Sequence, residues 1–191
     1  MGRFFWILYL RLKGWNTKTQ FPSGLKKCII IVAPHTSWVD LVMGLAYRSI
    51  FKLRYSRFLG KKELFDGPFG FFFRWLGGSP VDRFSKQNVV DQVVDLINSR
   101  DEIMIALAPE GTRKRVDRLR TGFYHIAKKA AVPIVMAGLD FSKKEIILSE
   151  PFYTTDDEEK DFEKIIRFFA PVQGRYPEKG LSHLLPDNVN Q

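Results

Sequence analysis

The chain has 191 residues and a mass of 22.2 kDa, close to the usual size of one domain, so two domains would each be cramped. Hydrophobic residues make up 45% and charged residues 27%, which excludes a collagen-like, low-complexity or wholly disordered chain. The net charge of +9 is concentrated at one end, because residues 1–65 hold 12 Lys and Arg against 2 Asp and Glu. This imbalance indicates a polyanionic partner, either nucleic acid or an anionic membrane surface.

The first expected element is an apolar run over residues 4–10, bracketed by Arg3, Arg11 and Lys13. It is far shorter than the ~20 residues needed to cross a bilayer, and no small-residue cleavage site of a secretory signal follows it. Two interpretations stay open: a segment lying in the headgroup region of a membrane, or a helix packed on the core. We treat residues 1–15 as an N-terminal interfacial segment, and expect a peripheral or monotopic protein on the cytoplasmic face of a membrane.

Short β-branched runs then alternate with helix-length amphipathic patterns. Strands are expected over 27–33, 53–60, 102–108, 132–139 and 145–149, and helices over about 37–50, 85–98, 121–131 and 156–169. This alternation predicts an α/β fold, a single domain with a mixed, mostly parallel sheet flanked by helices. Cys28 lies in the first strand and is expected to be a reduced core residue. The acidic residues 156–159 are expected to be solvated charges at a helix start.

The segment His35-Thr36-Ser37-Trp38-Val39-Asp40 directly follows the first strand. The preceding proline disfavours helix, and Thr36 or Ser37 can cap a helix that begins just beyond, so His35 is expected on the strand-to-helix loop. Asp40 can then fold back onto the imidazole. A carboxylate on one ring nitrogen leaves the other as an acceptor, as a general base for a hydroxyl requires. The Ser37-x-x-Asp40 spacing equally fits a capping box, in which Asp40 is structural.

A second polar segment, Ala108-Pro109-Glu110-Gly111-Thr112-Arg113, follows the apolar run 103–107. It is expected at the carboxyl end of a strand, where open α/β sheets bind ligands. A basic run continues beyond it with Lys114, Arg115, Arg118 and Arg120. Such a loop suits a phosphate or an anionic headgroup; the alternative is a solvated loop with no ligand.

Four blocks, in this order and spacing, resemble those of the glycerolipid acyltransferase family typified by 1-acylglycerol-3-phosphate O-acyltransferase. They are His35-x-x-x-x-Asp40 (the HX4D motif), Gly77-x-x-Pro80-Val81-Asp82-Arg83, Pro109-Glu110-Gly111-Thr112-Arg113 and Val132-Pro133-Ile134-Val135. The resemblance implies transfer of a fatty acyl group from acyl-CoA or acyl-carrier protein to the hydroxyl of a lysolipid. The acceptor it favours is 1-acylglycerol-3-phosphate, which would give phosphatidic acid in phospholipid biosynthesis.

The resemblance also implies roles for single residues of the acyltransferase domain, residues 16–191. His35 would be the base and Asp40 its orienting partner, and Arg83 would bind the phosphate of the acceptor. Acceptor binding would also involve Glu110, Gly111, Thr112 and Arg113, and Pro133 would help to shape the acyl end of the site. Some block positions depart from the family's usual residues: Pro34, Pro80, Ala108 and Met136. Another lysophospholipid or a lyso-aminolipid therefore stays an alternative acceptor.

Direct acyl transfer suits a His–Asp pair, because a thioester is already activated and only the acceptor hydroxyl needs a base. Backbone amides near the start of the helix after His35 are candidate donors to the oxyanion. The sequence has no phosphate-binding glycine motif, no nucleophilic-serine elbow and no Cys/His cluster of zinc spacing. We expect no metal and no cofactor beyond the thioester co-substrate.

An aromatic cluster in residues 67–76 holds Phe69, Phe71, Phe72, Phe73 and Trp75. It suits a membrane wedge or the wall of an acyl tunnel, but core packing is the favoured expectation. The alternative from a different functional class is a binding module, a basic domain whose aromatic side chains stack on single-stranded nucleic acid. It needs aromatics interleaved with basic residues on a sheet face, whereas here they stand in blocks. The expected partners are an anionic membrane surface, a lysolipid and an acyl thioester, and not nucleic acid.

Overall fold

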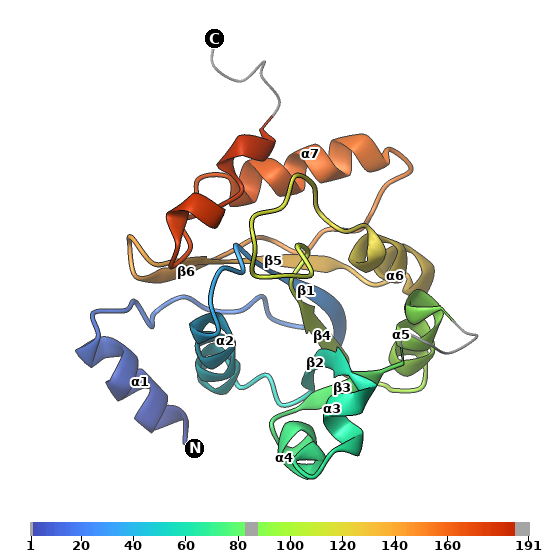
Figure 1. Ribbon diagram of the computed structural model, residues 1–191, viewed down its shortest axis with the longest axis horizontal. Helices are drawn as coiled ribbons and strands as arrows, with labels where there is room; N and C mark the ends of the chain where they lie inside the picture. The colour runs from blue at the N-terminus through green and yellow to red at the C-terminus, as the bar shows by residue number, and fades with distance from the viewer. Residues whose placement is uncertain (1, 83–87, 186–191) are drawn as a thin grey trace.

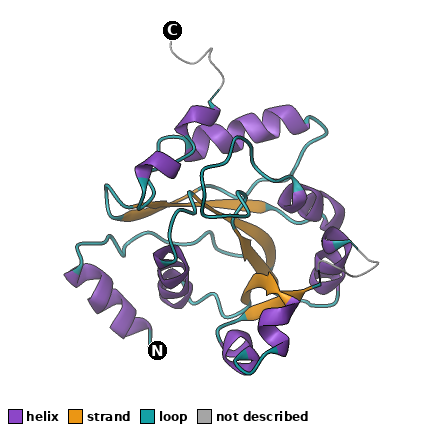
Figure 2. Ribbon diagram, viewed as in Figure 1, coloured by secondary structure: helices purple, strands orange, loops and turns teal. Residues whose placement is uncertain are grey.

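The β-branched runs of the chain form one six-stranded sheet in the computed structural model, which describes residues 2–82 and 88–185 (Figures 1 and 2). The strand order is β3-β2-β4-β1-β5-β6. The strands are β1 (Lys27–Ala33), β2 (Ser56–Lys61), β3 (Gly78–Val81), β4 (Ile103–Leu107), β5 (Ile134–Asp140) and β6 (Glu145–Leu148). All neighbours pair in parallel except β6, which is antiparallel to β5. The predicted α/β domain with a mixed, mostly parallel sheet is confirmed.

The helices lie on both sides of this sheet. They are α1 (Arg3–Leu12), α2 (Val39–Ile50), α3 (Lys62–Asp66), α4 (Gly70–Trp75), α5 (Val89–Asn98), α6 (Gly122–Ala130) and α7 (Glu158–Phe169). Two 3-10 turns, Pro177–Lys179 and Ser182–Leu184, follow α7. None of the helices in the described part of the chain has the length and apolarity to cross a bilayer.

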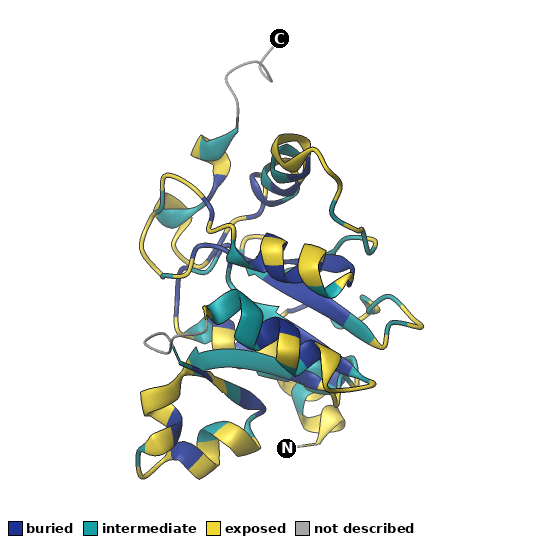
Figure 3. Ribbon diagram, turned by 90° about the vertical axis from the view of Figure 1, so that its right-hand side faces the viewer, coloured by how far each residue is buried: buried dark blue, intermediate teal, exposed yellow. Residues whose placement is uncertain are grey.

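Two apolar clusters separate the faces of the sheet. Because side chains alternate along a strand, Ile29 and Ile31 of β1 pack with α5, α6 and α7, whereas Cys28 and Ile30 pack with α2. Each covering helix turns its buried residues toward the sheet and its exposed residues outward, as Figure 3 shows. The Cys28 thiol is free and buried, and burial raises its pKa to about 12, as fits a core residue.

The N-terminal segment forms a helix that packs on the core, one of the two arrangements left open by its sequence. Leu10 is buried against the α2 layer, and the Arg3 Nε donates a hydrogen bond to the Ile50 carbonyl at 2.9 Å. The outer side of α1 stays exposed and carries Phe4, Phe5, Leu8, Tyr9 and Leu12. The helix is thus docked on the core by one face only.

The expectation of core packing for residues 67–76 is wrong for most of the aromatic side chains. Phe69, Phe71, Phe72 and Trp75 are exposed, and only Phe73 is partly buried. The segment forms the short α4 at the β2–β3 edge of the sheet, beyond which the described chain adds no further layer. The sequence prediction also missed β3, whose Pro80 is compatible with an edge strand, and began β2 three residues early.

Candidate active site

The loops that carry the predicted site lie side by side at the carboxyl ends of β1 and β4, which are neighbours in the sheet. The connection from β1 crosses one face of the sheet through α2, and the connection from β4 crosses the other face through α6. The two loops diverge, and such a divergence opens a crevice at the carboxyl edge of an α/β sheet. His35 and Glu110, 75 residues apart, meet there.

The His35 imidazole is held by Asp40, as the spacing predicted. The Nδ1 atom lies 3.1 Å from Asp40 Oδ2, and the His35 side chain is 26% exposed whereas the Asp40 side chain is buried. The same Oδ2 accepts backbone hydrogen bonds from Thr36 and Ser37, both at 2.8 Å. Asp40 therefore joins the backbone just before α2 and the imidazole through one oxygen, an arrangement compatible with both sequence interpretations.

This geometry determines which ring nitrogen is available. With a carboxylate at Nδ1, the favoured tautomer carries its proton on that atom, and Nε2 keeps a lone pair. His35 lines a cavity, so a hydroxyl brought there could transfer its proton to Nε2. The pair can act as a general base.

Glu110 lies beneath the His35 loop. Its Oε1 accepts a hydrogen bond from the His35 backbone N–H at 2.6 Å, while the buried Oε2 has no partner among the described residues. Burial raises the pKa of Glu110 above its ordinary value, and the hydrogen bond from His35 opposes this rise. The contact seen for Glu110 therefore fixes the backbone of the base.

The C-terminal segment supports the loop from the other side. The Tyr176 N–H donates to Thr36 Oγ1 at 3.3 Å, and a Cβ at Gly174 would lie 2.8 Å from the Thr36 methyl group. A larger residue at 174 would push Thr36 away. No local sequence signal marks this contact, because its partners are 140 residues apart.

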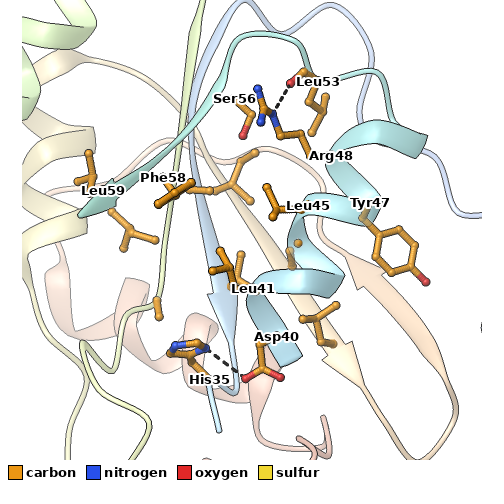
Figure 4. A pocket seen from close by; sticks show the side chains of 18 of the residues that line it. His35, Asp40, Leu41, Leu45, Tyr47, Arg48, Leu53, Ser56, Phe58 and Leu59 are labelled. Carbon is orange, nitrogen blue, oxygen red and sulfur yellow. Dashed lines mark hydrogen bonds and ion pairs between the residues drawn. The ribbon is translucent and has the colours of Figure 1, made fainter. Parts of the chain in front are cut away.

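A cavity of about 750 Å3 extends from His35 along α2, within the ~300–1,000 Å3 range of ligand pockets. Figure 4 shows His35 and Asp40 at one end and Arg48 and Ser56 at the other. Arg48 follows Asp40 by eight positions along α2, which places the two ends about 12 Å apart along the helix. The lining is mostly apolar and includes Leu41 and Leu45 of α2, Phe58 and Leu59 of β2, and Ile30 and Val32 of β1.

Small residues leave this space open. Gly44 on α2, Gly60 on β2 and Ala106 on β4 all line the cavity. At the far end the Arg48 guanidinium donates to the carbonyls of Leu53, at 3.4 Å, and Leu76, at 2.6 Å. These lining residues were not predicted from the sequence, although the apolar i, i+4 pair Leu41 and Leu45 beside Gly44 is a signal that could have indicated them.

The basic loop borders the mouth of the cavity. Gly111, Thr112 and Arg113 line it, and Gly111 has φ +66°, which favours glycine. The remaining cations of the loop are exposed: Lys114, Arg115, Arg118 and Arg120. The structure thus brings Arg113 and Thr112 to the same cavity as His35.

Other predicted site residues do not join this cluster. Arg83 lies outside the described residues, although Val81 and Val89 on either side of that gap line the cavity. Pro133 is buried next to Ile134, which pairs with Ile29 near the amino end of β1, and it is not among the described residues that line the cavity. Within the described chain, no group of three or more His, Cys, Asp or Glu is arranged to hold a metal ion.

The expected oxyanion donors are partly occupied. The Thr36 and Ser37 amides donate to Asp40, and the Val39 amide donates to Ser37 Oγ at 3.2 Å. These three N–H groups are used in building the loop. Of the candidate oxyanion donors near the start of α2, these three are therefore engaged within the loop itself.

Comparison with known proteins gives one family. A family model described as Acyltransferase matches residues 15–139. The matched range contains β1 to β4, the His35–Asp40 pair and the Glu110–Arg113 loop. Comparisons with curated proteins and with solved structures returned no match.

Proposed function

Because the chain belongs to the Acyltransferase family, we propose that it transfers a fatty acyl group from an acyl thioester to the free hydroxyl of a lysolipid. The observation that carries this proposal is the His35–Asp40 pair at one end of a long apolar cavity. The pair supplies a base for a hydroxyl, and the cavity has the apolar lining that a fatty chain requires.

In the proposed reaction, His35 Nε2 takes the proton of the acceptor hydroxyl as its oxygen attacks the thioester carbonyl. The new C–O bond forms, the C–S bond breaks, and the imidazolium returns the proton to the departing thiolate. Asp40 stabilises the imidazolium through Nδ1 and keeps the ring in orientation. Glu110 holds the backbone of His35, which limits the positions that the base can adopt.

The acyl chain of the donor is proposed to lie along α2, between Leu41 and Leu45 on one side and Phe58 on the other. Burying it there removes apolar surface from water at about 25 cal/mol per Å2. Arg48 and Ser56 close the far end of this path. Acyl-CoA and acyl-carrier protein both satisfy this arrangement as donors.

For the acceptor we propose 1-acylglycerol-3-phosphate, which would make phosphatidic acid the product. Arg113 at the cavity mouth, with the exposed cations that follow it, supports an anionic headgroup. The role of Arg83 as a phosphate ligand rests on the family resemblance alone. A lysolipid with a larger headgroup is the alternative, because the loop is exposed and sets no upper limit on headgroup size.

A lysolipid acceptor comes from a membrane, and we propose that α1 contacts an anionic one. Its exposed side carries Phe4, Leu8 and Leu12, next to the cations Arg3 and Arg11. A short helix with this composition suits the headgroup region, where the apolar side chains are buried and the cations meet anionic lipid. Vesicle binding that rises with anionic lipid content and falls with added salt would support this contact.

A panel of lysolipids tests the proposed function. Each acceptor is incubated with long-chain acyl-CoA or acyl-carrier protein, and the product is identified by mass spectrometry. The expected product is a diacyl lipid, formed fastest from 1-acylglycerol-3-phosphate. Faster acylation of a zwitterionic lysophospholipid would change the acceptor, and no acylated product from any pair would overturn the proposal.

A further inference from the structure

Four exposed aromatic side chains gather on and beside α4: Phe69, Phe71, Phe72 and Trp75, here called the aromatic platform. Phe71 is 73% exposed and Trp75 is 70% exposed. Residues 71, 72 and 75 share one side of the helix, since positions three and four apart lie above one another. Contiguous apolar patches on a protein surface mark interaction sites more often than single exposed residues do.

The buried residue Phe65 and its packing contacts hold the platform in place. Phe65 of α3 is 3% exposed, and its ring fits against two glycines, because a Cβ at Gly60 or Gly78 would lie 2.8 or 2.7 Å from it. Gly70 opens α4 directly above the Phe65 carbonyl, where a Cβ would clash at 1.9 Å. Arg74 Nη1 donates to that same carbonyl at 2.7 Å. The chain is thus packed so that Phe65 points inward and the platform points outward.

The chain segment that contains the platform is basic. Residues 51–76 hold six cations against two acids, namely Lys52, Arg54, Arg57, Lys61, Lys62 and Arg74 against Glu63 and Asp66. One cation, Lys62, is paired with Asp66 at 2.5 Å. Exposed aromatics bordered by an excess of cations complement a surface that is apolar beneath and anionic above.

The platform and α1 lie on opposite sides of the cavity. α1 packs on α2, whereas α3 and α4 pack on β2 and β3, and the cavity runs between α2 and β2. In Figures 1 and 3 both elements lie at the end of the molecule remote from α7. One surface could therefore touch both elements.

We propose that the aromatic platform is a second membrane contact, inserted into the headgroup region of an anionic bilayer across the cavity from α1. A second copy of the chain is a poorer occupant, because pairing two platforms would bring two basic borders together. An anionic bilayer removes that repulsion and buries the same aromatic surface. Contacts on both sides of the cavity would fix the orientation of its long axis relative to the membrane surface.

The test uses the full chain and vesicles of phosphatidylcholine mixed with phosphatidylglycerol, with no acyl donor or acceptor present. Its outcome therefore does not depend on the proposed reaction. The double variant Phe71→Ser/Trp75→Ser should lower the vesicle partition constant by about tenfold to a hundredfold, since two aromatic side chains are no longer buried in lipid. The control is Tyr153→Ser, which removes a side chain that is 65% exposed away from α1 and α4 and should leave binding unchanged.

A matched variant in α1, Phe4→Ser/Leu8→Ser, separates the two contacts. If both elements touch lipid, each double variant weakens binding, and their effects on the free energy add. If only the α1 variant weakens binding, the platform proposal is overturned and the α1 contact stands. Loss of a dimer in sedimentation with unchanged vesicle binding would assign the platform to a second copy and also overturn the proposal.

Discussion

The two faces of the sheet are covered differently. On the closed face, α5, α6 and α7 bury Ile31, Ile105 and Ile134 completely. On the open face, α2 leaves a cavity of about 750 Å3 over neighbouring positions of the same strands, among them Ile30, Val32 and Ala106. Alternate residues of one strand thus contribute to a fully packed core on one face and to a core with a cavity on the other.

This difference indicates that the two faces of the sheet have different roles, one in stability and the other in ligand binding. Dense packing on the closed face stabilises the domain and fixes where β1 and β4 end. The open face gives up part of that packing to keep room for a ligand. His35 and Glu110 stand at the shared edge, where a rigid sheet positions a site that opens to one side.

The largest expected effect is on catalysis at that edge, without loss of the fold. His35→Ala should lower the rate of acyl transfer by about 10²–10⁴-fold, because the acceptor hydroxyl loses its base. The His35 side chain is partly exposed, and among the described residues it hydrogen-bonds to Asp40 alone, so the melting temperature should change little. Steady-state kinetics and thermal unfolding measure both. A well-folded variant with near-normal turnover would contradict the mechanism.

Asp40→Asn distinguishes orientation of the base from helix capping. The amide oxygen of Asn can still accept from the Thr36 and Ser37 backbones, so α2 should keep its start. The same oxygen would also keep the imidazole contact, but the neutral amide lacks the charge that stabilises the imidazolium, so activity should fall by roughly 10²-fold or more. If Asp40 were only a cap, kcat would stay normal.

A matched pair of truncations compares the faces directly. Ile105→Ala on the closed face should cost about 2–5 kcal/mol of unfolding free energy, because it leaves a void in a packed core. Leu45→Ala on the open face only enlarges an existing cavity and should cost about 1 kcal/mol or less. Chemical denaturation measures the difference. Equal losses at the two sites would mean that the open face is as tightly packed as the closed one.

The same pair should differ in activity. Leu45→Ala is expected to raise the KM for a long-chain donor, since it removes a wall of the proposed acyl path. Ile105→Ala should leave that KM unchanged at temperatures where the variant is folded. A KM change in Ile105→Ala alone would contradict the separation of the two faces.

The smallest expected effect concerns Glu110. Burial raises its pKa in the folded state, so the folded chain binds this proton more tightly than the unfolded chain. The resulting stabilisation is complete below the unfolded pKa of about 4.3 and is lost as the pH rises to the folded pKa. Glu110→Gln keeps an acceptor for the His35 N–H but does not titrate. Its stability relative to the unmodified chain should therefore increase with pH across this window in denaturation measurements; a constant difference would contradict the raised pKa.

The parts of this structure that follow from local sequence could be predicted. β1 begins and ends where expected, because a β-branched run bounded by a basic residue and a proline is a strong local signal. The His35–Asp40 contact also follows from local spacing across a loop and one helical turn. The short edge strand β3 could not be predicted, because its pairing with β2 outweighs a Gly-Ser-Pro-Val sequence that favours no strand.

The parts that depend on tertiary packing could not be predicted. The Glu110 bond to His35 requires that β1 and β4 be neighbours, which the sequence does not specify. The exposure of α4 depends on its place at the edge of the sheet, where hydrophobicity alone would suggest burial. The cavity lies between α2 and β2, where the side chains of the two elements do not fill the space, so no single sequence motif marks it.

The most direct test of the central claim compares thiol release with ester formation in one reaction. The unmodified chain is given a long-chain acyl thioester with and without 1-acylglycerol-3-phosphate, and thiol, free fatty acid and diacyl lipid are measured together. Direct transfer predicts that thiol release requires the acceptor and that each thiol released is matched by one new ester. Thiol release at the same rate without acceptor, with free fatty acid as the product, would identify a thioesterase and contradict this account.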